Sequence, residues 1–131
     1  MNPDIMALTI EEARKSRMRH RVGAVVVNKK GKVVSSASNV MKSHPVQAMY
    51  AKKVNKEESI YLHAEIAAML RCYREDAHSI YVARLLRTGD LGLAKPCSIC
   101  TQMILDMDIS EVYYTKSSTL PNDVGVISYE V

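Results

Sequence analysis

The chain has 131 residues, a formal net charge of +4 and an apolar fraction of 47%, with seven Tyr but neither Phe nor Trp. This length predicts a single domain over residues 1–131, large enough to bury about two thirds of its unfolded surface. No apolar stretch approaches the roughly 18 residues of a membrane helix, and three cysteines are few for a disulfide scaffold, so we expect a soluble cytoplasmic protein without a membrane contact.

The first predicted element is a helix from Pro3 to about Arg19. Asn2-Pro3-Asp4 is a typical helix start, because it combines a capping side chain, a proline in the first turn and an acid near the positive end of the dipole. Basic residues gather toward its end: Arg14, Lys15, Arg17, Arg19, His20 and Arg21. Such a cluster can follow a phosphate backbone, but no aromatic residue interleaves it, which favours a solvated face. A neighbouring subunit or a substrate phosphate is a third partner for these charges.

Two strands and a long loop are predicted next. Residues 22–28 form an apolar run rich in β-branched side chains, as in a central strand that is covered on both faces. Asn28-Lys29-Lys30-Gly31 is turn chemistry, and the more polar residues 32–38 predict an edge strand. Residues 39–60 show no clear period and contain Pro45, so we expect a long loop, and long ordered loops are usually functional.

Residues 62–73 have helical spacing and place two reactive side chains, His63 and Glu65, in the first turn. The apolar stripe of this helix consists of Ile66, Ala67, Met69 and Leu70. A strand over residues 79–85 follows, and a loop containing glycine leads on from it.

The segment Pro96-Cys97-Ser98-Ile99-Cys100 starts the next predicted helix, over residues 98–107. Cys97 and Cys100 therefore lie on one face of its opening turn. A fourth strand is expected over residues 109–115.

The end of the chain is predicted to return antiparallel. Eight residues separate Thr115 from Val124, and they include Ser117-Ser118 and Pro121-Asn122-Asp123. A parallel crossover needs about a dozen residues or more. We therefore expect residues 124–131 to form a fifth strand, antiparallel to the fourth.

His63, Cys97 and Cys100 supply the imidazole and the two thiolates of a zinc site. Three protein ligands leave the fourth tetrahedral position open for water, and zinc lowers the pKa of that water toward neutrality. Glu65 lies two residues after His63, so its carboxylate can take a proton from that water and return it. Cys72 lies too far along the predicted helix to share the metal, and we expect it to be a buried small hydrophobe.

Other interpretations of these residues exist. A lone Cys-x-x-Cys pair is also typical of a dithiol redox pair or of half a structural zinc knuckle. A lone histidine in an apolar stretch is usually a core residue. A non-enzymatic, zinc-stabilised binding module would hold an inert and fully coordinated metal. The order His63, Glu65 and then Pro-Cys-x-x-Cys favours a catalytic site over all three.

The two blocks resemble the signature of the zinc-dependent cytidine and deoxycytidylate deaminase superfamily, H-x-E followed by P-C-x-x-C. The flanks agree, because residues 22–27, Gly31 and Ser38-Asn39 resemble the first hairpin of the family and its substrate-contacting asparagine. The similarity covers roughly residues 5–115. It implies a three-layer α/β/α fold of the cytidine deaminase type, with helices on both faces of a five-stranded mixed sheet whose last strand is antiparallel.

The resemblance implies hydrolytic deamination of a cytosine-bearing nucleoside or nucleotide, of the cytidine or deoxycytidylate type, to the uracil product and ammonia. Glu65 would then be catalytic without being a ligand, and the backbone N–H of Ala64 would hold the pyrimidine carbonyl. Asn39 would contact the sugar hydroxyl or the base, although a strand-ending turn residue is an equal expectation. His44, in the long loop, and Tyr114, at the end of the fourth strand, are further candidate substrate contacts; a solvated loop and a packed core are the alternatives.

The alternative function is a nucleic-acid deaminase that acts on tRNA adenosine or on single-stranded cytosine. It would use the same metal chemistry on a base taken out of its stack. The basic run supports it, whereas the short tail and the missing aromatic platform oppose it. In this superfamily the antiparallel ending is typical of the branch that acts on free cytidine, while the local motifs look more like the deoxycytidylate branch. Family members this short usually assemble, so the resemblance also implies a homo-oligomer.

Overall fold

The computed structural model describes residues 1–117, 123–130 of the chain, and within them a mixed sheet of six strands is packed with four α-helices. The strands are β1 (Arg21–Val27), β2 (Val33–Ser38), β3 (Ser79–Leu85), β4 (Leu91–Gly92), β5 (Glu111–Thr115) and β6 (Val124–Ser128). The helices are α1 (Pro3–Arg14), α2 (Pro45–Lys53), α3 (Ala64–Leu70) and α4 (Ser98–Asp106), with a 3-10 turn at Arg74–Asp76. None of the described helices has the length and apolar character needed to span a bilayer.

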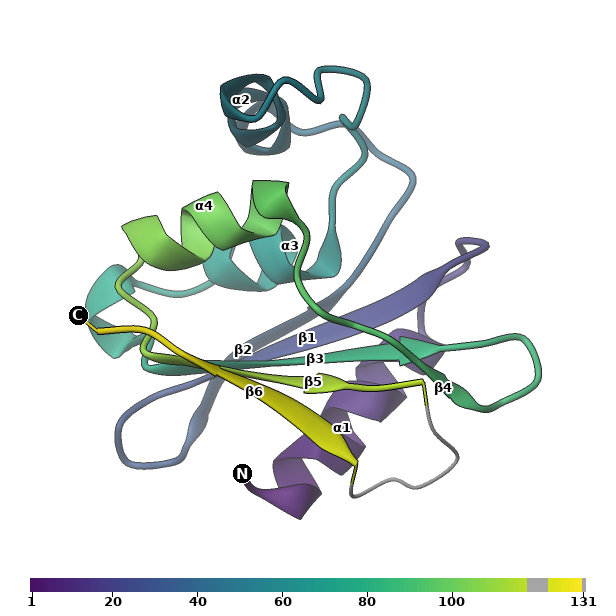
Figure 1. The fold of residues 1–131 in the computed structure, drawn as a ribbon, viewed down its shortest axis with the longest axis vertical. Coiled ribbons are helices and arrows are strands. Elements are labelled where there is room, and N and C mark those ends of the chain that lie inside the picture. The colour runs from purple at the N-terminus through teal and green to yellow at the C-terminus, as the bar shows by residue number, and fades with distance from the viewer. Residues whose placement is uncertain (118–122, 131) are drawn as a thin grey trace.

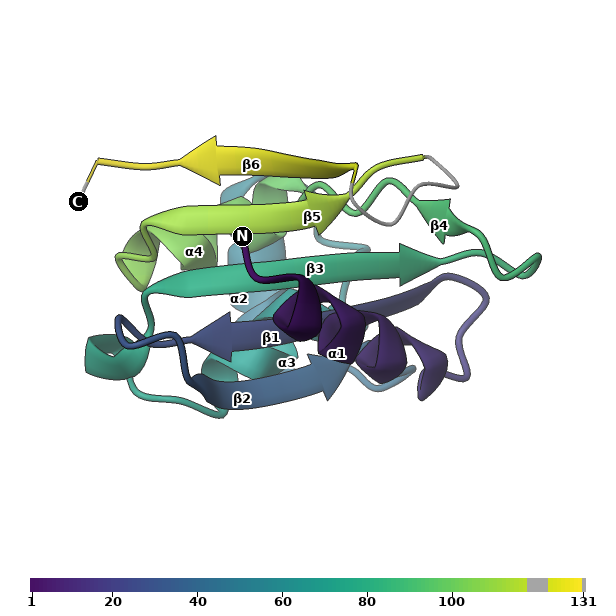
Figure 2. The ribbon, with the colours of Figure 1, turned by 90° about the horizontal axis from the view of Figure 1, so that it is seen from below.

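The strand order across the sheet is β2-β1-β3-β5-β6, as Figure 2 shows. β1 is antiparallel to both β2 and β3, β3 and β5 are parallel, and β6 is antiparallel to β5. The predicted antiparallel return is therefore confirmed, with Val124 paired to Thr115. The predicted count of five strands is corrected to six, because β4 pairs with the end of β3. A strand of two residues is too short to show any periodicity in the sequence.

Helices cover both faces of the sheet, as predicted (Figure 1). α1 lies on one face, α3 and α4 lie on the other, and α2 lies beyond α4. β3 shows why the central strands are continuously apolar: Ile80 and Val82 belong to the core under α3 and α4, whereas Tyr81 and Ala83 belong to the core under α1. Side chains alternate between the faces of a strand, so both sets of positions must be apolar when both faces are covered.

α1 begins as predicted and ends earlier. The Asn2 side chain accepts hydrogen bonds from the backbone N–H groups of Asp4 (2.9 Å) and Ile5 (3.2 Å). The helix ends at Arg14 and does not continue to Arg19. Ser16 explains the difference, because its hydroxyl accepts from the Met18 N–H at 3.2 Å and donates to the Asn39 carbonyl at 3.1 Å. Most of the basic run consequently lies in the segment between α1 and β1.

The contact between α1 and β1 depends on Gly23. A Cβ atom added at Gly23 would lie 2.4 Å from the backbone nitrogen of Ala13 and 2.5 Å from the backbone oxygen of Thr9. We expect Gly23→Ala to lower the free energy of unfolding by about 1–3 kcal/mol, because backbone atoms of α1 must move away. Urea denaturation measures this loss, with Ser36→Ala on the neighbouring strand as the control. Unfolding curves that coincide for Gly23→Ala and the parent would contradict the close approach.

Residues 39–60, expected to be a loop, contain α2. His44 caps this helix, with its Nδ1 accepting from the Val46 N–H at 3.1 Å, and Pro45 occupies the first turn. Its buried positions are Gln47, Tyr50 and Ala51. The helical period was missed because one of these buried positions is a polar glutamine, so the apolar spacing is incomplete.

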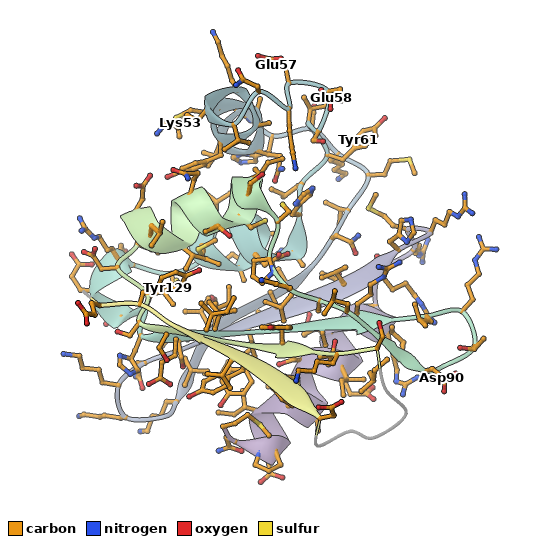
Figure 3. All side chains as sticks on the ribbon, in the orientation of Figure 1. Lys53, Glu57, Glu58, Tyr61, Asp90 and Tyr129 are labelled. Carbon is orange, nitrogen blue, oxygen red and sulfur yellow. The ribbon has the colours of Figure 1, made fainter. Side chains whose placement is uncertain are left out.

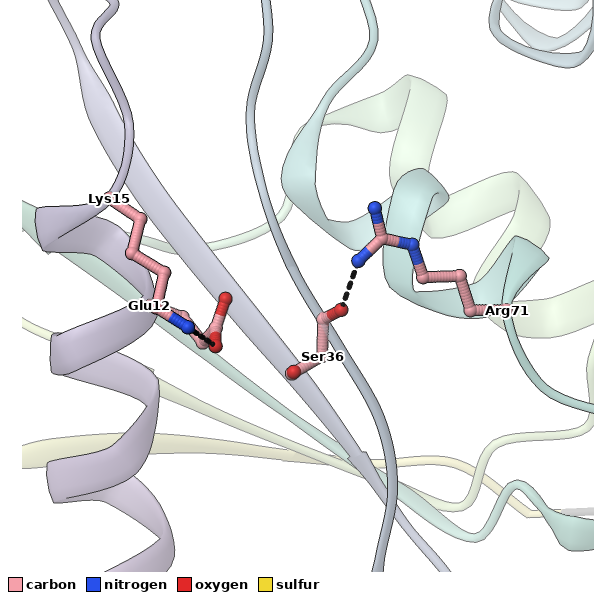
Figure 4. A network of polar contacts seen from close by, with 4 residues as sticks. All are labelled: Glu12, Lys15, Ser36 and Arg71. Atoms are coloured by element: carbon pink, nitrogen blue, oxygen red, sulfur yellow. Dashed lines mark hydrogen bonds and ion pairs between the residues drawn. The ribbon is translucent and has the colours of Figure 1, made fainter.

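α3 is tied to the edge strand β2 by two hydrogen bonds near the C-terminal end of the helix. Ser35 Oγ donates to the carbonyl of Ala68 at 2.8 Å, and Arg71 Nη1 donates to the carbonyl of Ser36 at 2.7 Å (Figure 4). The same figure shows an ion pair at the end of α1, between Glu12 and Lys15, the residue that follows the helix; Lys15 Nζ is 2.7 Å from Glu12 Oε1. α3 ends at Leu70, before the predicted end at residue 73.

Candidate metal centre

Three side chains from two helix starts meet on the α3 and α4 side of the sheet. His63 is the residue that precedes α3, Cys97 is the residue that precedes α4, and Cys100 lies in the first turn of α4. The Nδ1 atom of His63 is 3.3 Å from Cys100 Sγ and 3.7 Å from Cys97 Sγ. The structure therefore brings together the three residues that the sequence singled out as ligands.

This donor set fits a zinc ion. The three ligand atoms all lie within 4.8 Å of one another. Tetrahedral zinc, with Zn–N and Zn–S bonds of about 2.0–2.3 Å, places its ligand atoms about 3.3–3.8 Å apart. Among the described residues, no fourth His, Cys, Asp or Glu joins the group. Cys72, half-buried just beyond α3, is outside it. The site thus has the three protein ligands of an open zinc centre rather than the four of a closed one.

The two thiols have opposite electrostatic tendencies. The hydrogen bond from Cys100 lowers the pKa of Cys97, and His63 lowers it further. The interaction with Cys97, together with burial, raises the pKa of Cys100. A divalent cation would bind both sulfur atoms as thiolates, and the start of α4 places positive dipole ends beside them.

Glu65 is a buried carboxyl beside this cluster. It lies in the first turn of α3 and is only 6% exposed. Burial raises the pKa of Glu65 above the ordinary carboxyl value, while the nearby His63 opposes the rise. A carboxyl whose pKa is raised holds its proton more readily, which suits a group that must take up and return a proton as a general acid and base.

Gln47 of α2 holds the start of α3 in place. Its side chain is fully buried, with Oε1 accepting from the His63 backbone N–H at 3.1 Å and Nε2 donating to the Ser59 carbonyl at 3.3 Å. Sequence reasoning missed this residue because it lies in the segment expected to be a loop. A fully polar side chain between Val46 and Ala48 carried no signal of burial.

We expect Gln47→Ala to weaken zinc retention by about 10–100-fold, since a residue that orients a ligand is lost. The His63 N–H would also lose its partner, which costs about 1–3 kcal/mol of stability. Competition with a coloured chelator measures zinc retention. Gln102→Ala is the matched control, because Gln102 is exposed on α4. Chelator curves that overlap for Gln47→Ala and the parent would exclude this positioning role.

A pocket of about 490 Å³ opens beside the cluster, and His63, Glu65 and Cys97 form part of its wall. The rest of the wall comes from β1 and the segment before it, the residue after β2, the segment between α2 and α3, the end of β3 and the segment between β4 and α4. Glu58 and Tyr61, labelled in Figure 3, line it from the segment before α3. A ligand in this pocket would lie directly against Glu65 and the candidate zinc ligands.

Two of the four predicted substrate contacts line this pocket. Ala64 is the first residue of α3, so its N–H has no partner within the helix. Asn39 lines the pocket and also serves the turn, because its Oδ1 accepts from the Val22 N–H at 3.0 Å and its Nδ2 donates to the His20 carbonyl at 2.6 Å. Both of the roles weighed for Asn39 are thus compatible with its position.

The other two predicted contacts, His44 and Tyr114, are not among the residues that line the pocket. The His44 ring caps α2. The Tyr114 ring lies against Gly125 of β6, where an added Cβ would come within 2.1 Å of the ring carbon Cζ. Their substrate roles stay predictions that this geometry does not support. The pocket instead contains two basic residues that sequence reasoning passed over, Arg84 and Lys95.

Comparisons with known proteins agree with this architecture. A family model described as the cytidine and deoxycytidylate deaminase zinc-binding region matches residues 2–116. Among curated protein sequences, none matches the chain. The following three solved structures, all below 25% sequence identity, share its fold.

The cytidine deaminase from Mycobacterium leprae aligns with a TM-score of 0.58 and 17% identity over 96% of this chain and 93% of that chain. The cytidine deaminase from Mycobacterium tuberculosis aligns with a TM-score of 0.56 and 19% identity, over 88% and 85% respectively. The dCMP deaminase from the cyanophage S-TIM5, in apo form, aligns with a TM-score of 0.53 and 21% identity, over 88% and 86%. The likeness to these structures concerns the fold, and the family model adds the zinc-binding region.

Proposed function

Because the chain belongs to the cytidine and deoxycytidylate deaminase family, we propose that it hydrolyses the exocyclic amine of a cytosine-bearing nucleoside or nucleotide. The products are the uracil compound and ammonia. The observation that carries this proposal is the position of Glu65, a buried carboxyl that shares one pocket wall with the His63 and Cys97 side chains.

His63, Cys97 and Cys100 would hold the zinc ion, which supplies the Lewis acidity that brings the pKa of water toward neutrality. Glu65 takes a proton from the attacking water as its oxygen bonds to C4 of the ring, and passes that proton to N3. It then moves the second proton of the water to the amine as the C4–N bond breaks and ammonia leaves. The carboxyl of Glu65 finishes in its starting state, as a proton shuttle must.

Ala64 and Asn39 would orient the base in this reaction. The free N–H of Ala64, at the start of α3, is suited to a carbonyl oxygen of the pyrimidine, and Asn39 borders the other side of the pocket. Glu65 would thereby meet C4 and N3 rather than another edge of the ring. The antiparallel β6, which in this superfamily accompanies action on free cytidine, supports a small molecule over a nucleic acid.

A substrate panel tests the proposal. The zinc-loaded protein is incubated with cytosine, cytidine, deoxycytidine, their mono- and triphosphates, adenosine, guanine and a cytosine-containing single-stranded oligonucleotide. Ammonia release and product identity are recorded for each. We expect turnover of cytosine nucleosides or nucleotides. Turnover of the oligonucleotide or of adenosine alone, or of no compound, would overturn the proposal.

A further inference from the structure

We propose that Arg84 and the basic residues around it bind the 5′-phosphate of the substrate, so that the enzyme prefers a cytosine nucleoside monophosphate to the nucleoside. This inference rests on the proposed function, since it concerns the far end of the molecule whose base is deaminated. It assigns a specificity-determining role to Arg84, and two observations support it independently of the metal centre.

The first observation is the unusual environment of the Arg84 guanidinium. Arg84 follows Ile80 and Val82 on the same face of β3, so it projects toward the side of the sheet that carries the pocket. Its Nη2 is 2.9 Å from Nδ1 of His20, which makes that histidine nitrogen the acceptor. Among the described residues, the buried Nε of Arg84 has no hydrogen-bond partner. Within the part of the chain that the structure describes, no ion pair joins an acidic side chain to this guanidinium.

A guanidinium keeps its charge at any physiological pH, and it presents its N–H groups in a fixed fork. Leaving a buried N–H unpaired is energetically unfavourable, because the group has lost its bond to water and gained none in the protein. A phosphate satisfies such a fork with two parallel, charge-assisted hydrogen bonds. Rotation about the terminal side-chain bonds of Arg84 would let Nε and one Nη donate hydrogen bonds to the same phosphate group.

The second observation is a smaller basic pocket beside the large one. It measures about 190 Å³ and shares His20 and Arg84 with the pocket that contains Glu65. Arg19 and Arg87 add two further guanidinium groups to its wall, and none of the acidic residues in the described ranges 1–117 and 123–130 lines it. Asp90, labelled in Figure 3 at the turn between β3 and β4, lies outside both walls and accepts a hydrogen bond from Thr88.

The short strand β4 gives Arg84 its position. Arg84 pairs with Gly92, where an added Cβ would lie 3.2 Å from Cδ and 3.3 Å from Cγ of the Arg84 side chain. The aliphatic stem of Arg84 thus packs over a residue without a side chain. In this arrangement a cytosine at Glu65 and a phosphate on the three arginines occupy two adjoining pockets with a common wall formed by His20 and Arg84.

The test compares deoxycytidine with deoxycytidine 5′-monophosphate in kcat/KM. We expect the parent to prefer the monophosphate by at least about 100-fold. In Arg84→Gln this preference should fall by about 10–100-fold, the range for losing a charged hydrogen-bonded contact. In Arg84→Lys, which keeps the charge but lacks the forked N–H groups, the preference for the monophosphate should fall by less than in Arg84→Gln. Arg14→Gln removes a charge from α1, outside both pockets, and should keep the parent preference within about twofold.

A binding measurement separates this inference from the proposed function. Calorimetry with the products, deoxyuridine monophosphate and deoxyuridine, needs no turnover. The parent should bind the monophosphate more tightly than the nucleoside. In Arg84→Gln the ratio of the two dissociation constants should shrink by at least about tenfold. If no cytosine compound is deaminated but this binding pattern holds, the proposed function fails and the phosphate site stands.

If deoxycytidine is deaminated as efficiently as its monophosphate, or Arg84→Gln keeps the full preference, the phosphate site is overturned and the deaminase stands. Faster turnover of a single-stranded oligonucleotide than of the monophosphate would also overturn it. In that case the basic pocket would follow a nucleic-acid backbone, with steeply salt-dependent binding.

Discussion

Replacing Glu65 with glutamine is expected to lower kcat by at least about 10²–10⁴-fold while the protein keeps its zinc. The amide matches the carboxyl in shape, so the fold around α3 and the three ligand side chains should persist. An amide cannot take a proton from water and return it to the ring and the amine, which removes the general acid and base. Burial of Glu65 makes the substitution mild for the fold, because a neutral amide is easier to bury than a carboxylate.

Steady-state kinetics and metal analysis of the same preparation measure both halves of this result. Glu57→Gln is the matched control, because Glu57 is exposed on the segment after α2 and does not line the pocket (Figure 3). Its kcat should equal that of the parent. A near-normal rate in Glu65→Gln would refute the role given to this carboxyl.

Replacing Cys97 with alanine is expected to remove most of the bound zinc and to lower thermal stability. Cys97 provides one of only two thiolates in the group, and its loss leaves a histidine and a single sulfur on which to hold the ion. A metal that binds only the folded state adds about 2.7 kcal/mol of stability at 100 times its dissociation constant. The variant should lose this contribution, together with the link between the starts of α3 and α4.

Cys72→Ala is the control for this experiment, because it removes a thiol that is outside the ligand group. We expect that variant to bind one zinc ion per chain and the Cys97→Ala variant to bind little. Added zinc should raise the melting temperature of the zinc-free parent and leave that of Cys97→Ala almost unchanged. Full zinc occupancy of Cys97→Ala would show that the ligand set is wrong.

The parts of the structure that short local patterns encode were predictable from the sequence. β3 has the predicted bounds, and the antiparallel β6 followed from a connection too short for a parallel crossover. The grouping of His63 with Cys97 and Cys100 followed from ligand chemistry and from the order of the motifs. These inferences needed only the chain spacing and the properties of the residues concerned.

The parts that depend on tertiary packing were not predictable. Gln47 is buried because its amide bridges the start of α3 and the segment before it, and no local period marks such a residue. β4 consists of two residues and is defined by its pairing with the end of β3, where Gly92 lies opposite Arg84. A pairing of this kind leaves no pattern in the local sequence. A clue to Arg84 was present, since it is a charged residue inside an otherwise apolar run. The predicted homo-oligomer and the single domain over residues 1–131 stay predictions.

X-ray absorption spectroscopy at the zinc edge tests the central claim most directly. The claim predicts one zinc ion per chain with two sulfur ligands at about 2.3 Å and two nitrogen or oxygen ligands at about 2.0–2.1 Å, one from His63 and one from a small exchangeable molecule. Adding the uridine product should alter the light-atom shell and leave both sulfur ligands in place. A zinc-free protein, or a centre closed by four protein ligands that no product perturbs, would contradict the account.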